Sequence, residues 1–262
     1  MRYKIFRSLR KTAILILFIG QINTAHATPV TTDLVGYWAG DGTANDTSGQ
    51  ENHGTLHGGV SFIPGIFGQA FSFDGDNDWI STSQSFIDGQ SHTISVWVNW
   101  KGHTASEFQE IVGWWDPSVT PFSSRMFLGV AQGVQGPMRY GDDWTNVQIN
   151  LQQNEWVHLL ATYDGTTNNR NVYLNGVLAD SLSNSAVAMF ANLSIGRQGS
   201  GSEYWNGAID ELALYSRVLE QNEITSLAMR PSAVPIPSAI WLFGSCLIGL
   251  FGMSTSRGRV LQ

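Results

Sequence analysis

Acidic and amide side chains crowd a Gly-rich stretch near the start of this sequence, where calcium is the chemistry to consider. Asp41, Asn45 and Asp46 lie within Asp-Gly-Thr-Ala-Asn-Asp. Calcium takes several oxygen ligands from carboxylates, amides and backbone carbonyls. These side chains predict a structural calcium site, which Asp210 would complete if its strand runs beside the first strand. The alternative is that the same acids accept backbone amides and shape turns.

Tryptophans stand beside carboxylates at several points, a combination that suits sugars. A sugar ring stacks its C–H groups on an indole, and its hydroxyls bond to acids. Trp38, Trp97 and Trp156 have apolar neighbours and are predicted to be core. The candidate ligand-binding residues are Trp115, Asp116, Asp142, Asp143, Trp144 and Trp205.

The sequence offers no set of residues with the spacing of a catalytic site. A retaining glycosidase needs two carboxylates about 5 Å apart. Asp76 and Asp78 are two residues apart, but they lie in a Gly- and Asn-containing turn that explains them without catalysis. There is no Gly-x-Ser-x-Gly turn for a nucleophilic serine. His158 lies in an apolar run and is predicted to be a strand residue with one hydrogen bond. We expect a protein that is not an enzyme.

Strands must position these residues, because short β-branched and aromatic runs recur between Gly, Asn, Asp and Ser turns. Asn175-Gly176 predicts a tight hairpin. Helical spacing is convincing only over residues 218–228. One two-sheet sandwich over residues 28–230 is therefore favoured. The predicted strands cover 34–38, 69–73, 79–82, 92–98, 125–130, 156–163, 171–174, 193–196 and 208–215.

Charge and cysteine content exclude several classes of partner. Residues 28–230 hold all 21 acidic residues and only seven of the 14 Lys and Arg. An excess of about 14 negative charges disfavours nucleic acid and anionic membranes. The single cysteine, Cys246, lies outside this region, so the predicted sandwich has no disulfide.

Both ends of the chain are predicted to be targeting segments. Residues 1–27 have a basic start, an apolar run and Ala25-His-Ala27, the pattern of a cleaved signal peptide. Residues 231–238 are the expected linker. Residues 239–262 combine a short apolar run with Arg257 and Arg259, which predicts a terminal hydrophobic helix that anchors the chain in a membrane.

Several segments in order resemble the concanavalin A-like jelly roll of the laminin G and pentraxin superfamily. They include Leu34–Trp38 with the loop up to Gly54, Phe67–Gly75, Thr93–Val98, and Trp205–Arg217. The resemblance implies an all-β, two-sheet antiparallel sandwich that binds carbohydrate or an extracellular polysaccharide matrix without catalysis. The alternatives are a structural or adhesive protein that binds other proteins, and a divergent polysaccharide hydrolase or lyase. The resemblance to pentraxins implies a second calcium site at Asp76, Asn77 and Glu203.

The C-terminal segment resembles the PEP-CTERM sorting signal of Gram-negative bacteria. Val234-Pro-Ile-Pro237 precedes Trp241-Leu-Phe-Gly-Ser245, the apolar run and the two arginines. The usual Glu between the prolines is absent, and Gly258 interrupts the basic end. The resemblance implies processing by an exosortase-type protease after transient anchoring in the inner membrane, and a final place on the outer surface or outside the cell.

Overall fold

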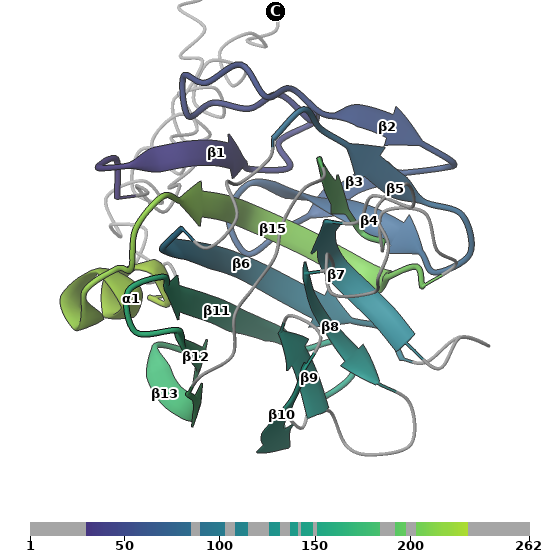
Figure 1. Cartoon of the computed structure of the whole chain (residues 1–262). Coiled ribbons are helices and arrows are strands. Elements are labelled where there is room, and N and C mark those ends of the chain that lie inside the picture. Colours follow the sequence, from purple (N-terminus) through teal and green to yellow (C-terminus); the bar gives the residue numbers. More distant parts are fainter. Residues whose placement is uncertain are drawn as a thin grey trace, which may run out of the picture.

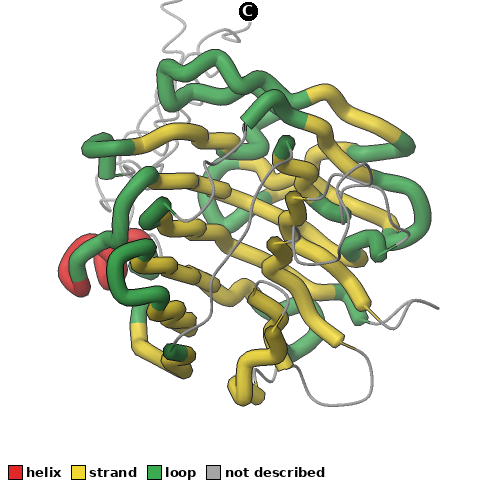
Figure 2. Tube along the Cα trace, viewed as in Figure 1, coloured by secondary structure: helices red, strands yellow, loops and turns green. Residues whose placement is uncertain are grey.

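The computed structural model describes residues 30–84, 90–102, 108–114, 126–131, 137–140, 143–148, 151–183, 192–197 and 203–229. Within these residues, two antiparallel sheets lie face to face with one short helix, α1, at one side (Figures 1 and 2). The all-β jelly-roll sandwich predicted from the sequence is confirmed. The signal peptide, the linker and the terminal hydrophobic helix lie outside the described residues.

The first sheet has eight strands in the order β13-β12-β11-β6-β15-β4-β3, with β1 also paired to β15. β15 pairs with β4 through its first half and with β1 through its second half. The last long strand therefore runs beside the first, as expected. The strands are β1 (Leu34–Trp38), β3 (Ser61–Pro64), β4 (Gln69–Asp74), β6 (His92–Trp100), β11 (Trp156–Asp164), β12 (Asn169–Leu174), β13 (Val177–Leu182) and β15 (Asn206–Tyr215).

The second sheet has seven strands in the order β10-β9-β8-β7-β14-β5-β2. Figure 1 shows this sheet in front of the first. Several of its strands were not predicted, because they are short or lack a run of β-branched residues. The strands are β2 (Thr55–His57), β5 (Trp79–Ser81), β7 (Phe108–Trp114), β8 (Met126–Ala131), β9 (Pro137–Tyr140), β10 (Asp143–Gln148) and β14 (Leu193–Ile195).

The main hydrophobic core fills the space between the sheets, and it includes Trp38, Trp114 and Trp205. Trp97 is buried in contact with α1 instead, through a hydrogen bond from its Nε1 to the Leu227 carbonyl. Trp156 is only half-buried, so its predicted place in the core is wrong. Three of the chain's ten tryptophans thus fill the space between the two sheets with large indoles.

A second apolar cluster lies where α1 (Gln221–Leu227) packs on the first sheet. Ile224 and Leu227 of the helix are buried with Tyr37, Ala213 and Tyr215. Glu220 and Glu223 form a capping box at the start of the helix. The predicted helix is confirmed. Among the described residues, no helix has the length and apolarity needed to cross a bilayer.

The Asn175-Gly176 hairpin is also confirmed between β12 and β13. Asn175 and Gly176 have φ of 49° and 81°, the left-handed pair that a tight hairpin turn requires. The turn lies against the helix, because Gln221 donates a hydrogen bond to the Gly176 carbonyl at 2.8 Å.

Candidate functional site

A histidine and a tryptophan stack on the outer face of the seven-stranded sheet. Ile80 points into the core, so its neighbours Trp79 and Ser81 point to the opposite face. His57 lies directly across from Trp79 on β2. The two ring centroids are 3.9 Å apart and the ring planes differ by 10°. A contact of 2.9 Å between His57 Nε2 and Ser81 Oγ fixes the imidazole.

Arg197 covers the other face of Trp79. Its guanidinium carbon lies 3.7 Å from the indole centroid, too close for it to share a face with the His57 ring. The same guanidinium is 5.8 Å from the Tyr204 ring, and Arg197 and Tyr204 form a β-bridge. His57, Trp79, Arg197 and Tyr204 make up the stacked cluster. Such stacking fixes the plane and the direction of a guanidinium.

The backbone before Arg197 admits only glycine. Gly196 has φ of +80°, and a Cβ there would come within 2.4 Å of the Phe73 ring. The turn at Gly196 delivers Arg197 from the buried strand β14 to the surface of the sheet.

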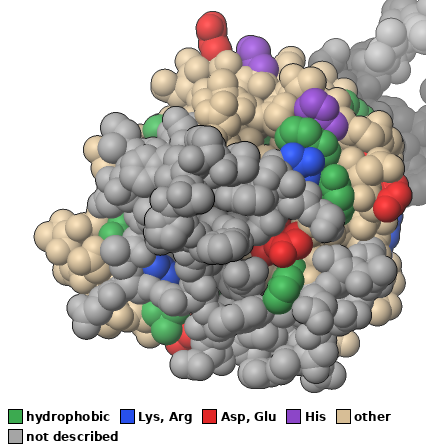
Figure 3. Space-filling model, turned by 45° about the vertical axis from the view of Figure 1, so that its right-hand side comes forward, with side chains coloured by type: hydrophobic (Ala, Val, Ile, Leu, Met, Phe, Trp, Pro, Cys, Tyr) green, Lys and Arg blue, Asp and Glu red, His purple; other side chains and the backbone are tan. Residues whose placement is uncertain are grey.

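Two glutamates accompany the stacked cluster. The Glu110 amide donates to the Glu203 carbonyl at 3.2 Å, and the Trp205 amide donates to the Gly196 carbonyl at 2.8 Å, so the two glutamates and Arg197 come from adjoining segments. The Glu110 carboxylate lies over β8, because a Cβ on Gly129 would be 2.1 Å from Glu110 Oε2. Figure 3 shows a face where histidine, hydrophobic, basic and acidic side chains gather. Carboxylate, guanidinium and phenol are the groups that hold sugar hydroxyls.

Trp205 was predicted to be a ligand-binding residue, and the structure places it out of reach of a ligand. Its indole is fully buried in the core, and its Nε1 donates to the Ala208 carbonyl at 3.4 Å. Trp115, Asp116 and Asp142 lie outside the described residues. Asp143 and Trp144 begin β10 opposite Tyr140 and Arg139, and their side chains are also outside the description. The sequence signal for the stacked cluster was Trp79, which lies in a predicted strand. The next residue, Ile80, is apolar and is expected to face the core, so Trp79 is expected to face outward.

The first predicted calcium set is not assembled. Asp46 accepts the amides of Tyr37, Ser48 and Asn52 at 2.8–2.9 Å, so its carboxylate is engaged by the backbone. Asp41 accepts the Gln69 amide at 2.7 Å, and Asn45 is exposed. Asp210 accepts the amides of Ile66 and Phe67. These contacts are those of the turn-shaping alternative.

Two residues of the second predicted calcium set, Asp76 and Asn77, lie in the turn after β4. The Asp76 and Asn77 amides donate to Asp74 Oδ1, which is the bonding pattern of a turn. Glu203 lies beside the stacked cluster. In the described parts of the chain, no three His, Cys, Asp or Glu residues are placed to hold a metal ion.

A cavity that was not predicted from the sequence lies beside a bulge in β15. Ile209 and Leu212 both point into the core, so Asp210 and Glu211 between them both face outward. Glu211 has φ of 53°, a left-handed conformation that is costly for a residue with a Cβ. In a regular strand, residues that face the core are two positions apart. Ile209 and Leu212 are three positions apart, and this irregular spacing is the sequence signal for the bulge.

Both outward carboxyls are buried, and burial raises their pKa values. The pKa of Glu211 rises to about 7 through desolvation, although a hydrogen bond from the Tyr37 hydroxyl partly opposes the shift. Desolvation raises the pKa of Asp210 to about 8, and the nearby Glu211 charge adds to the effect. A buried acid holds its proton because the anion loses its hydration.

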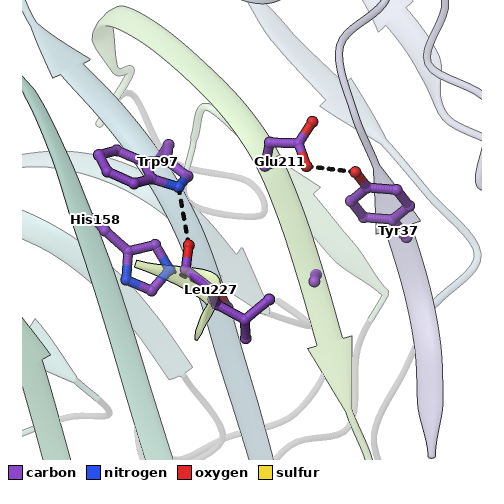
Figure 4. A pocket seen from close by; sticks show the side chains of 7 residues that line it. Tyr37, Trp97, His158, Glu211 and Leu227 are labelled. Atoms are coloured by element: carbon purple, nitrogen blue, oxygen red, sulfur yellow. Dashed lines mark hydrogen bonds between the residues drawn. The ribbon is translucent and has the colours of Figure 1, made fainter. Parts of the chain in front are cut away.

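Glu211 lines the cavity together with Tyr37, Ser95, Trp97, His158, Ala213 and Leu227. Figure 4 shows the Tyr37–Glu211 pair on one side and His158, Trp97 and Leu227 on the other. Ser95 and His158 bond at 2.9 Å, which confirms the predicted single hydrogen bond of this histidine. We call this space the polar cavity.

The sequence profile of the concanavalin A-like lectin/glucanases superfamily, in its laminin G type, matches residues 74–225. This span is more than half of the chain, and the chain belongs to that family. The superfamily includes both binding modules and glycosidases. Among curated proteins, none matches the sequence.

Solved structures share the fold at low sequence identity. Domain 4 of AbnA, an extracellular GH43 arabinanase from Geobacillus stearothermophilus solved with arabinotriose, is 21% identical with a TM-score of 0.60, and the match covers 75% of this chain and 98% of that domain. The binding domain of Paraclostridial Mosquitocidal Protein 1 is 16% identical with a TM-score of 0.55, over 75% and 52% of the two chains. The receptor-binding domain of botulinum neurotoxin type G is 15% identical with a TM-score of 0.54, over 75% and 51%.

Proposed function

We propose that this protein is an exported, non-catalytic module that binds a polysaccharide through the outer face of its seven-stranded sheet. The observation that carries the proposal is the stacked cluster, which fixes an arginine between a tryptophan and a tyrosine on that face. The arabinotriose-bound relative is a binding domain of the same fold, which supports a glycan as the kind of ligand.

The cluster suggests how a sugar would be held. Both faces of Trp79 are occupied, so this indole serves to orient Arg197 and is not the stacking platform. Tyr204 would offer its ring to the sugar, and the charged side chains of Arg197 and Glu203 would lie on the polar side of the same site. This mode differs from the tryptophan stacking that the sequence suggested.

Export through residues 1–27, anchoring through residues 239–262 and processing by an exosortase-type protease complete the proposal. The module would then act on the outer surface of a Gram-negative bacterium or outside the cell. The PEP-CTERM-like order of residues 234–259 supports this part.

Arg197→Ala is expected to weaken glycan binding about tenfold or more, since hydrogen bonds to a charged group contribute about 1.5–3 kcal/mol. The full chain, in a detergent without a sugar headgroup, is applied to an array of polysaccharides that includes arabinan, and Kd is then measured on any binder. Lys101→Ala removes an exposed cation outside the cluster and is the matched control. No binding across the array, or equal binding by Arg197→Ala and the wild type, contradicts the proposal.

Calcium binding stays a prediction, and the backbone contacts of Asp41 and Asp46 favour the turn-shaping alternative. If calcium supports the fold, adding it to chelator-treated protein raises the thermal midpoint of unfolding, since a ligand of the folded state stabilises it. A midpoint that is the same in calcium and in chelator contradicts the prediction. Magnesium is the control cation, because it prefers a smaller and more rigid site.

A further inference from the structure

The polar cavity is small and lies on the outer side of the eight-stranded sheet. Its residues come from β1, β6, β11, β15 and the end of α1. The space open to the centre of a water molecule is about 10 Å³. This is close to the room that one water needs. The cavity is therefore too small for a sugar and suited to a ligand of water size.

His158 presents a ring nitrogen that no protein atom satisfies. Its side chain is fully buried, and only Nε2 is bonded, to Ser95 Oγ. Nδ1 is buried without a hydrogen-bond partner. Burial lowers the pKa of His158 to about 3, so the ring is neutral near pH 7. A buried polar nitrogen without a partner destabilises the folded state, so native proteins rarely leave one.

The other wall of the cavity holds a second hydrogen-bonded pair. The Tyr37 hydroxyl donates to Glu211 Oε2 across β1 and β15. Strand register explains why the two pairs meet: His158 on β11 and Asp210 on β15 both lie opposite Trp97 on β6, and Glu211 follows Asp210 in the bulge. The cavity thus has the Ser95–His158 pair on one side and the Tyr37–Glu211 pair on the other.

We propose that the polar cavity binds one water molecule as part of the fold, and that this water joins His158 Nδ1 to the Tyr37–Glu211 pair. Water both donates and accepts, so it satisfies His158 in either neutral tautomer. If Nδ1 carries the proton, this N–H group donates a hydrogen bond to the water, and the water donates one to the Glu211 carboxyl. If Nδ1 is bare, the water donates to it.

The end of α1 closes the site. The Leu227 side chain lines the cavity, and the Leu227 carbonyl accepts the Trp97 Nε1–H at 3.3 Å. Leu227 and Ile224 also anchor the helix in the outer apolar cluster. Because the helix end covers the cavity, the water would exchange slowly with solvent.

A high-resolution crystal structure of the full chain tests the proposal. The expected result is one fully occupied water within hydrogen-bond distance of both His158 Nδ1 and the Glu211 carboxyl. No density there, or Nδ1 bonded directly to a protein atom, overturns it. Crystals of Glu211→Gln should keep the water, because Gln keeps a polar group on that wall.

His158→Phe provides a second test, because it removes Nδ1 and keeps a ring of similar size. Loss of the water from this variant supports the proposal, and its persistence at the same position overturns it. If His158→Phe does not fold, solution NMR of the wild type replaces it: nuclear Overhauser contacts between a long-lived water and the His158 ring support the proposal, and their absence overturns it.

Discussion

Replacing Glu211 by Gln is expected to stabilise the protein by about 3 kcal/mol at pH 8 and to change little at pH 4. The pKa of Glu211 lies at about 7 in the folded protein against an ordinary value of 4.5. Each pKa unit corresponds to about 1.4 kcal/mol, which sets this magnitude. Gln can still accept the Tyr37 hydrogen bond, so the variant removes the ionisation and keeps the contact.

The direction in which stability changes with pH follows from the number of protons bound by the folded and unfolded states. Between pH 4.5 and 7 the folded protein keeps the Glu211 proton while the unfolded chain has lost it. Stability therefore falls as pH rises through this window, and it is lowest once the folded carboxyl has also ionised. Asp210, whose pKa is raised to about 8, acts in the same direction and extends the fall to higher pH.

The groups that face Glu211 are few. Tyr37 of β1 bonds to it, Asp210 precedes it, and Asp41 adds a further negative charge that raises its pKa. His158 of β11 lines the same cavity and is neutral near pH 7. No cation lines the cavity among the described residues, so none favours the ionised form there.

Urea unfolding followed by tryptophan fluorescence at pH 5, 6, 7 and 8 measures the effect. The wild type should lose stability across this series, and Glu211→Gln should lose clearly less. Glu155→Gln makes the same substitution at an exposed position and should follow the wild type. Parallel curves for Glu211→Gln and the wild type would show that Glu211 does not titrate as proposed.

The strands that the sequence predicted are those with a continuous apolar or alternating run. β6 and β11 are examples, because each contains an unbroken run of six or seven buried residues. β2 and β13 were missed, since they are short or mostly exposed edge strands that leave little hydrophobic periodicity. The helix was predicted because its apolar stripe and its Glu220 cap are local features.

The sites were harder to predict because they depend on register between distant strands. Asp210 was expected near the first Gly-rich loop, and β15 does run beside β1. A bulge at Asp210 and Glu211 then decides what each carboxyl meets: Asp210 reaches the Ile66 amide, and Glu211 reaches Tyr37. The stacking of Arg197 on Trp79 likewise joins residues 118 positions apart, which no local pattern reveals.

Asp46→Ala is expected to destabilise the protein by about 3 kcal/mol. The buried carboxylate accepts three backbone amides, from Tyr37, Ser48 and Asn52. Hydrogen bonds to a charged group contribute about 1.5–3 kcal/mol each, and water entering the loop of the variant offsets part of the loss. Asp46→Asn keeps one acceptor oxygen and should lose about half as much. Denaturant unfolding at pH 7 measures both variants.

The pH dependence separates this carboxylate from Glu211. Burial alone would raise the pKa of Asp46, but its hydrogen bonds from Ser48, Tyr37 and Asn52 outweigh burial and lower it. The contribution of Asp46 to stability is therefore present above the ordinary pKa of 3.8 and is lost as pH falls through the lowered pKa.

Asp76→Ala is the control for Asp46→Ala. It removes an exposed turn carboxylate and should cost less than about 0.5 kcal/mol. If Asp46→Ala costs no more than Asp76→Ala, the three amide bonds do not hold the loop. If calcium shifts the stability of the wild type and of Asp46→Ala equally, or shifts neither, the carboxylate acts on the backbone alone.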